Sequence, residues 1–282
     1  MVKARLIPLA AAVLLCASCQ YSHEYSWQKY RIDGHRTGVT APSADNVPQA
    51  LGVVAGDTYT APNGRSFRKG SATYGVAADL IAVQPQMKDL KEVVGFAPRP
   101  MAASAPESEL SNWWVDRLMV DVADLTRRKV DVGFLNFGGI RVDLPQGDLL
   151  LDDFVSMSPF KNYLTYVALK GSDLKEIFNF IAASRPFVIG GAKLVVNNHR
   201  IDTLLVGGKP IDPKKTYGVA TVDFLIDGGD GMTVGKNARE MIVTNTTVID
   251  AVLPYVRSLQ AAGKPVEYFT DGRCTYDSWE EE

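Results

Sequence analysis

Histidine and cysteine, which often bind metals or act in catalysis, are scarce in this sequence. Its 282 residues include three histidines and three cysteines, namely His23, His35, His199, Cys16, Cys19 and Cys274. A hydrolytic site with two metal ions needs several His, Asp and Asn ligands, so three histidines are too few. The sequence also lacks a Gly-x-Ser-x-Gly elbow and a Walker phosphate loop. It therefore predicts no catalytic residues and no metal site in this chain.

Neither sign of charge is in excess. The chain has 30 Lys and Arg against 32 Asp and Glu, a formal net charge of -2 at pH 7. A phosphate backbone is bound by a surplus of basic side chains, so the composition argues against a nucleic acid polymer as partner. A single nucleotide is not excluded. With 46% hydrophobic and 22% charged residues, the composition is that of an ordinary globular protein.

Long apolar runs are also missing. The run at residues 6–15 is too short to span a bilayer. It follows Lys3 and Arg5 and precedes Ala17-Ser18-Cys19, which is the layout of a secretory signal. This end resembles a bacterial lipoprotein signal, in which the cysteine is lipidated and becomes the first mature residue. We expect residues 1–18 to be removed and the protein to be exported to the periplasm or cell surface, with Cys19 as its lipid anchor to the membrane.

Two alternatives to lipidation remain open: plain cleavage without a lipid, and a retained anchor helix. Cys16 stands where the lipoprotein pattern usually has leucine. If Cys19 is acylated, Cys274 is the only thiol left, and no intramolecular disulfide can form.

Residues 19–77 are rich in Asn, Gly, Pro, Ser and Thr, which favour turns. We interpret them as a tether or a partly ordered arm. The spacing of apolar residues between positions 77 and 94 predicts one or two short helices, interrupted at Pro85. We expect one domain over residues 78–276 and an acidic tail over residues 277–282.

The expected domain mixes helices and strands. Apolar residues at three- and four-residue steps predict helices over 107–125, 172–181 and from 246 or 247 onward, the second with Ser172 as its N-cap. Strands are predicted over 130–135, 163–169, 193–197, 203–206, 217–226 and 266–269. This order includes hairpins and no regular alternation, so the predicted fold class is α+β, a mixed sheet with flanking helices.

Three segments at predicted strand ends or loops carry residues suited to ligand binding. They are Asn136-Phe137-Gly138-Gly139-Ile140-Arg141, Ser158-Pro159-Phe160-Lys161-Asn162 and Phe224-Leu225-Ile226-Asp227-Gly228-Gly229-Asp230-Gly231. The planar guanidinium of Arg141 suits an oxyanion, and neighbouring glycines let a phosphate approach backbone N–H groups. Two phenyl rings, Phe160 and Phe224, could enclose a base. Taken singly, a phenylalanine placed like Phe224 is more often a core residue, and an arginine placed like Arg141 is more often a surface charge.

Together and in this order, the three segments resemble the C-terminal domain of 5'-nucleotidases, including periplasmic UDP-sugar hydrolases and animal ecto-5'-nucleotidases. The resemblance runs from about residue 94 to residue 273. It implies that Phe160 and Phe224 clamp the base, Asn136 contacts the base, Arg141 with Gly138 and Gly139 meets the phosphate region, and Asp230 binds the ribose. The family usually has a further arginine before the helix at 107–125. Ser104-Ala105-Pro106 occupies that region here, and Arg99 is the candidate substitute.

Two short motifs echo metal-binding patterns of the family's other domain. Asp33-Gly34-His35 spells Asp-x-His but lies in the polar arm with no apolar strand before it. Asn198-His199 is followed by Arg200 where a carboxylate is wanted. We interpret both as chance.

The leading hypothesis is that this chain is the nucleotide-binding, specificity half of a 5'-nucleotidase or UDP-sugar hydrolase-type phosphoesterase. Divalent metals and hydrolysis would come from a separate metallophosphoesterase chain. The alternative is a non-catalytic surface lipoprotein that binds nucleosides or nucleotides for uptake or sensing. A third possibility is a relic pocket in a domain that only acts as a scaffold.

Overall fold

The computed structural model describes residue 42 and residues 45–277. Cys19, His23 and His35 lie outside the described residues, so the predicted lipid anchor and the Asp33-Gly34-His35 motif are not placed. Within the described part, no helix combines the length and apolar composition needed to cross a membrane.

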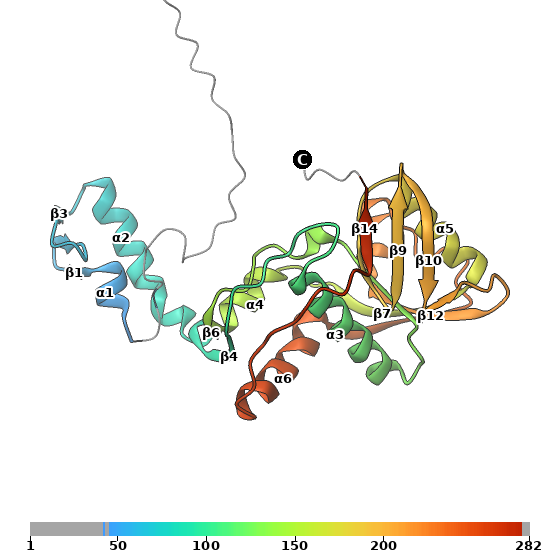
Figure 1. Cartoon of the computed structure of the whole chain (residues 1–282). Coiled ribbons are helices and arrows are strands. Elements are labelled where there is room, and N and C mark those ends of the chain that lie inside the picture. Colours follow the sequence, from blue (N-terminus) through green and yellow to red (C-terminus); the bar gives the residue numbers. More distant parts are fainter. Residues whose placement is uncertain (1–41, 43–44, 278–282) are drawn as a thin grey trace, which may run out of the picture. The chain divides into compact units, whose positions relative to one another are not determined.

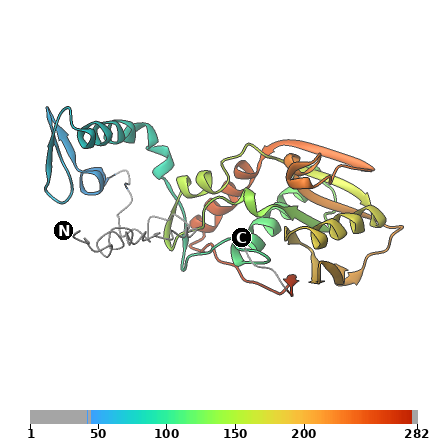
Figure 2. The same cartoon turned by 90° about the horizontal axis from the view of Figure 1, so that it is seen from above.

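The segment before the main domain contains regular elements that we did not predict. Its bounds are α1 Val47–Leu51, β1 Val53–Ala55, β2 Thr58–Thr60, β3 Ser66–Arg68 and α2 Ala72–Val83. The strands form an antiparallel sheet of order β1-β2-β3, drawn in blue in Figure 2. A strand of three residues is too short to show an alternation of apolar and polar residues, so the sequence indicated only turns here. The boundary that we expected between residues 77 and 78 falls inside α2.

Two short 3₁₀ turns, η2 Gln84–Met87 and η3 Asp89–Lys91, follow α2. The predicted interruption at Pro85 is present, because the α-helix ends at Val83 and the chain tightens at the proline.

The domain that follows is built on a five-stranded mixed sheet of order β13-β7-β12-β5-β8. Figure 1 labels two of its strands, β7 and β12. The strands are β5 Val132–Leu135, β7 Tyr163–Lys170, β8 Val188–Gly190, β12 Thr216–Val222 and β13 Glu240–Thr247. Strand β12 pairs with β5 in parallel, and the other neighbours in this sheet are antiparallel. The predicted class, a mixed sheet with flanking helices, is confirmed.

Helices cover both faces of this sheet. They are α3 Glu109–Thr126, α5 Gly171–Ala183 and α6 Val248–Ala261, whereas α4 Leu151–Met157 packs against α6. In β5, a Cβ on Gly133 would lie 2.7 Å from Val115 and Met119 of α3. The ring of the next residue, Phe134, packs against Phe178 of α5, with 5.2 Å between the two ring centres. Successive strand residues point to opposite faces, so α3 and α5 lie on opposite sides.

A second sheet has the order β11-β10-β9-β14. Its strands are β9 Ala192–Asn197, β10 Arg200–Val206, β11 Lys209–Pro210 and β14 Cys274–Tyr276, and a separate pair is made by β4 Val93–Ala97 and β6 Gly147–Leu150. The strands predicted over 193–197 and 203–206 pair antiparallel as β9 and β10, with Asn198 and His199 as the turn, both at positive φ.

Three predictions about element bounds were wrong. Residues 266–269 form no strand. The N–H of Val266 donates to Phe96 O, but the preceding residue, Pro265, has no N–H with which to extend a ladder of hydrogen bonds. The edge beside β9 is β14 instead. The strand predicted over 217–226 ends at Val222, and α5 begins at Gly171 with Lys170, not Ser172, in the N-cap position.

Candidate functional site

One cavity of about 220 Å³ gathers all seven residues that the sequence analysis assigned to ligand binding. It is lined by Asn136, Gly138, Gly139, Arg141, Phe160, Asn162, Phe224 and Asp230. These residues come from three segments that are far apart in the sequence. The seven were predicted from three motifs and the family resemblance that these motifs carry, and the fold brings them together at one cavity.

Asn136 and the glycine pair follow the carboxyl end of β5. All four residues of β5 are buried, and the chain then enters the 3₁₀ turn Phe137–Gly139. A Cβ on Gly139 would lie 2.9 Å from Asn136 Oδ1. Glycine at this position therefore leaves room for the Asn136 side chain to reach across the loop, where its Nδ2 donates to Asp230 Oδ2 at 2.6 Å.

The two phenyl rings are half exposed, although phenylalanine is usually buried. Phe160 is 45% exposed and Phe224 is 46% exposed. Asp223 Oδ1 accepts the N–H of Phe224 at 3.0 Å and the N–H of Tyr163 at 2.9 Å. This one carboxylate ends β12 early and ties the Phe224 turn to the segment that carries Phe160. Phe224 is therefore a cavity residue and not part of the core.

Arg141 is the one cationic side chain among the residues that line the cavity. Its guanidinium lies 5.9 Å from the centre of the Phe160 ring, and one of its nitrogens donates to Gly138 O at 3.2 Å. The backbone N–H of Arg141 donates to Met157 O at the end of α4. The Arg141 guanidinium and the Phe160 ring therefore lie side by side at the cavity.

Asp230 lies in a left-handed conformation, with φ of 51° and ψ of 25°, between Gly229 and Gly231. A Cβ on Gly229 would lie 1.9 Å from Phe224 O, so only glycine allows this approach. Asp230 Oδ1 also lies 2.9 Å from a guanidinium nitrogen of Arg185. The carboxylate is therefore held from two sides.

Asn162 and Arg185 were not among the predicted site residues. Asn162 lay within a segment that had been singled out, two residues after Phe160. Arg185 follows α5 and is 45 residues from Asp230 in the numbering, so no local pattern linked the two.

Arg99, the candidate substitute for the missing arginine, is not among the residues that line the cavity. Its guanidinium pairs with Glu109 and donates to Tyr268 O. His199 lies in the β9–β10 turn. Among the described residues, no group of three His, Cys, Asp or Glu side chains is placed to hold a metal ion.

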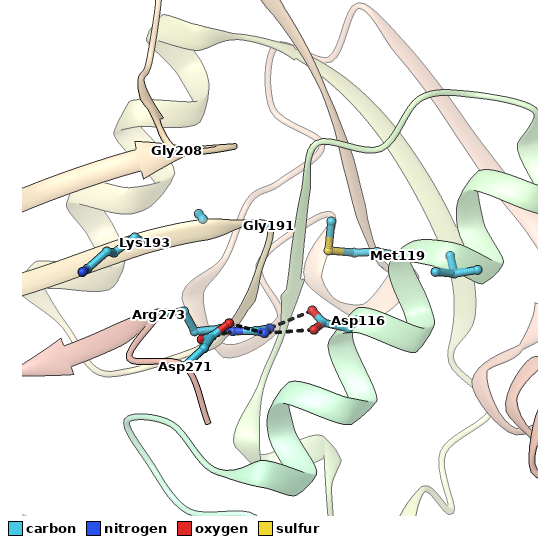
Figure 3. Close-up of a pocket in the computed structure, with 9 residues that line it drawn as sticks. Asp116, Met119, Gly191, Lys193, Gly208, Asp271 and Arg273 are labelled. Carbon is cyan, nitrogen blue, oxygen red and sulfur yellow. Dashed lines mark hydrogen bonds and ion pairs between the residues drawn. The ribbon is translucent and has the colours of Figure 1, made fainter. Parts of the chain in front are cut away.

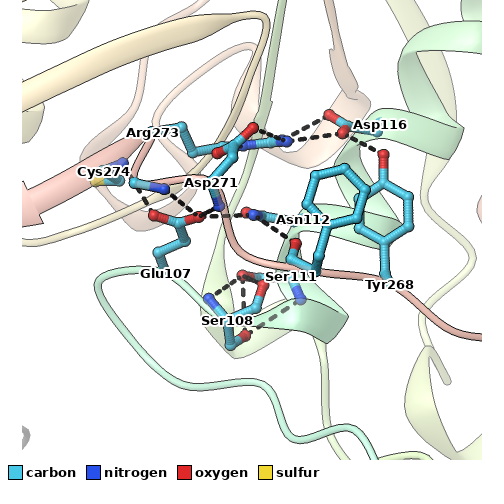
Figure 4. Close-up of polar contacts among 11 residues, drawn as sticks. Glu107, Ser108, Ser111, Asn112, Asp116, Tyr268, Asp271, Arg273 and Cys274 are labelled. Atoms are coloured by element: carbon cyan, nitrogen blue, oxygen red, sulfur yellow. Dashed lines mark hydrogen bonds and ion pairs between the residues drawn. The ribbon is translucent and has the colours of Figure 1, made fainter.

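A larger depression of about 530 Å³ lies elsewhere, beside α3 and β9 (Figure 3). Three of its charged side chains pair with one another: Arg273, 8% exposed, donates to both oxygens of Asp116 and to both oxygens of Asp271. These contacts continue into a network around Glu107 and Tyr268 (Figure 4). Arg273, Asp116 and Asp271 thereby hold the C-terminal segment against α3.

A comparison with known families agrees with this geometry. The family described as "5'-nucleotidase, C-terminal domain" matches residues 92–237, more than half of the chain. The chain belongs to this family. The match covers β5, the turn at Phe137–Gly139, the segment of Phe160 and the loop of Asp230, which together form the cavity.

Curated relatives of this 5'-nucleotidase C-terminal domain are longer proteins. Protein UshA of Yersinia enterocolitica is 33% identical over 136 residues, 46% of this chain and 24% of that protein. The 5'-nucleotidase of Vibrio cholerae is 29% identical over 155 residues, 53% of this chain and 27% of that protein. The chain thus matches about a quarter of the length of each.

Solved structures show the same fold. The 5'-nucleotidase precursor of Thermus thermophilus superposes with a TM-score of 0.63 at 23% identity, over 76% of this chain and 46% of that one. The NAD nucleotidase of Haemophilus influenzae gives a TM-score of 0.55 at 18% identity, over 79% of this chain and 48% of that one.

Proposed function

We propose that this domain binds a nucleoside or nucleotide in the cavity lined by Phe160 and Phe224. In this proposal it is the base- and ribose-recognising half of a nucleotide-hydrolysing phosphoesterase, and a separate metallophosphoesterase chain supplies the divalent metals and the hydrolysis. The observation that supports it is the convergence of two half-exposed rings, a carboxylate and a cation on one small cavity.

Each of these groups matches one part of a nucleotide. Stacking of a base on an aromatic ring is worth roughly 1–3 kcal/mol and tolerates any base, and both rings have exposed area to offer. The carboxylate of Asp230 accepts hydrogen bonds from ribose hydroxyls. Arg141 offers a planar fork to a phosphate, although its exposure to water weakens that attraction.

We further propose that the protein is exported and anchored in a membrane through lipidated Cys19. The sequence order of basic residues, a short apolar run and Ala17-Ser18-Cys19 supports this. Mass spectrometry of the protein from native membranes should find an acylated N-terminal Cys19, and a Cys19→Ala variant should lose membrane attachment. An unmodified N-terminus would overturn the anchor.

A second candidate function is nucleoside capture without hydrolysis, for uptake or sensing. The guanidinium of Arg99 pairs with Glu109 and donates to Tyr268 O, so Arg141 is the one cation among the residues that line the cavity. A nucleoside needs no phosphate clamp, so this arrangement favours the second candidate over the binding of several phosphates.

Calorimetric titration with adenosine, AMP and UDP-glucose tests the binding proposal. Loss of both rings in a Phe160→Ala/Phe224→Ala variant should weaken binding at least tenfold, because each lost stacking contact is worth roughly 1–3 kcal/mol. Phe96→Ala is the matched control, since Phe96 is 44% exposed and does not line the cavity. Unchanged affinity in the double variant, or no binding by the wild type, would contradict the proposal.

The same titrations distinguish the two candidates. Tighter binding of AMP than of adenosine supports the hydrolase half, and equal or tighter binding of adenosine supports nucleoside capture. A metallophosphoesterase should be recovered with the protein from native membranes, and mixing the two should raise nucleotide hydrolysis. Absence of that gain would contradict the two-chain arrangement.

A further inference from the structure

Arg185 is a charged residue beside the candidate cavity to which no role has been assigned. It does not line the cavity, yet its guanidinium lies 2.9 Å from Asp230 Oδ1. The other oxygen of Asp230 accepts from Asn136 Nδ2 at 2.6 Å. The two donors hold the two oxygens separately, so they fix the plane of the carboxylate.

Three features hold Arg185 in place. It is followed by Pro186, and a residue before proline is restricted to extended conformations. Its guanidinium lies 5.7 Å from the centre of the Phe187 ring, and Phe187 is itself 1% exposed. The preceding residue, Ser184, closes α5 with its backbone N–H and its hydroxyl, both of which donate to Phe180 O. Arg185 is half exposed, but its backbone and its stacking surface are fixed.

The chemistry of the carboxylate shows what this achieves. Each carboxylate oxygen offers two acceptor positions, and the contacts above use one on each oxygen. One position therefore remains on each oxygen, which matches two neighbouring hydroxyl groups. An aspartate side chain rotates easily about its last torsion. With Asn136 alone, the second oxygen of Asp230 would not be oriented.

We propose that Arg185 is a positioning residue that, through Asp230, makes the cavity select ribose over 2'-deoxyribose. This inference rests on the proposed nucleoside or nucleotide binding and adds to it a sugar preference. The ligand class is a nucleoside or nucleotide with free 2'- and 3'-hydroxyls. Arg185 acts only through Asp230 and does not touch the ligand.

The test compares adenosine with 2'-deoxyadenosine by calorimetric titration of the full chain. The wild type should bind adenosine more tightly. Arg185→Ala should weaken adenosine binding about fivefold, as expected for a partly exposed ion pair, and should leave 2'-deoxyadenosine binding nearly unchanged. Arg185→Lys should restore part of the ratio, because it keeps the charge without the planar fork. Arg200→Ala is the control, since Arg200 has no ion-pair partner in the part of the chain described.

A double-mutant cycle separates positioning from a general structural effect. In an Asp230→Ala background, the further change Arg185→Ala should alter neither affinity. An Arg185→Ala protein that keeps the wild-type sugar ratio, or an equal loss in the Asp230→Ala background, would overturn the inference while leaving nucleoside binding intact. If the wild type binds neither nucleoside, the proposed function itself fails, and the inference fails with it.

Discussion

Single residues around Arg273 show how buried charge is stabilised in this domain. Burial opposes the charge of Arg273, but its bonds to Asp271 and Asp116 outweigh this effect and raise the pKa of the guanidinium. Arg273 in turn lowers the pKa of the Asp271 carboxyl. The thiol of Cys274, next in the chain, has a pKa raised to about 12 by burial and by Glu107. A thiol with that pKa is almost fully protonated at neutral pH and therefore a poor nucleophile.

The hydroxyl of Tyr268 gives a pH-dependent prediction. It donates to Asp116 Oδ2 at 2.7 Å, and burial, followed by Asp116, raises the pKa of Tyr268 to about 12. The value in an unfolded chain is about 10. The neutral hydroxyl is the stabilising form, so its contribution is complete below pH ~10 and is lost as the pH rises toward 12.

Tyr268→Phe should therefore lower the free energy of unfolding at pH 7 by about 1 kcal/mol. It should also reduce the loss of stability between pH ~10 and 12. Urea unfolding at a series of pH values measures both effects, with the exposed Tyr163→Phe as control. Parallel pH curves for wild type and Tyr268→Phe would contradict the assigned contact.

At the scale of elements, the ends of strands and helices carry the function and much of the local stability. The loops after β5 and β12 supply most of the cavity, and the start of α3 is closed by a capping box. Ser108 Oγ accepts the N–H of Ser111, and Ser111 Oγ accepts the N–H of Ser108. Ser108 Oγ also accepts the N–H of Ser104, so this hydroxyl also holds the loop that precedes α3.

Ser108→Ala should lower the free energy of unfolding by about 1 kcal/mol, the usual cost of losing an N-cap. The loss should be somewhat larger than this usual cost, because Ser108 is only 7% exposed and water cannot replace the lost hydrogen bonds. Denaturant unfolding measures the change. The exposed Ser156→Ala in α4 should differ from wild type by less than about 0.5 kcal/mol. Equal effects of the two changes would exclude a special role for the cap.

Over the whole molecule, the C-terminal segment is stabilised by contacts with the start of α3. The carboxylate of Glu107 accepts from Asn112 Nδ2 and the Asp271 N–H at 2.8 Å, and from the Gly272 N–H at 3.2 Å (Figure 4). Next to these contacts, β14 adds in parallel to β9 and completes the edge of the four-stranded sheet. The side chain of Glu107 thus holds the backbone of Asp271 and Gly272, which lie more than 160 residues further along the chain.

Glu107→Ala should open this segment locally. Amide hydrogen exchange over residues 271–276 should become at least tenfold faster, since several charge-assisted bonds of about 1 kcal/mol or more each are lost. Exchange in β7 should stay as in wild type. Glu92→Ala, which removes an exposed pair with Arg257, is the control. A uniform increase across the domain would instead indicate global destabilisation.

The sequence by itself determined the fold class, the long helix stripe of α3, the buried strands β5 and β7, and the seven cavity residues. Apolar spacing is a local pattern, and the order of the three segments carries the resemblance to the 5'-nucleotidase C-terminal domain, so both can be detected before the fold is known. Only the tertiary structure decided the rest. It paired Arg185 with Asp230 and Glu107 with the C-terminal segment, ended β12 at Asp223, and placed β14 rather than residues 266–269 at the sheet edge. Each of these depends on a partner distant in sequence, and no local pattern encodes such a partner.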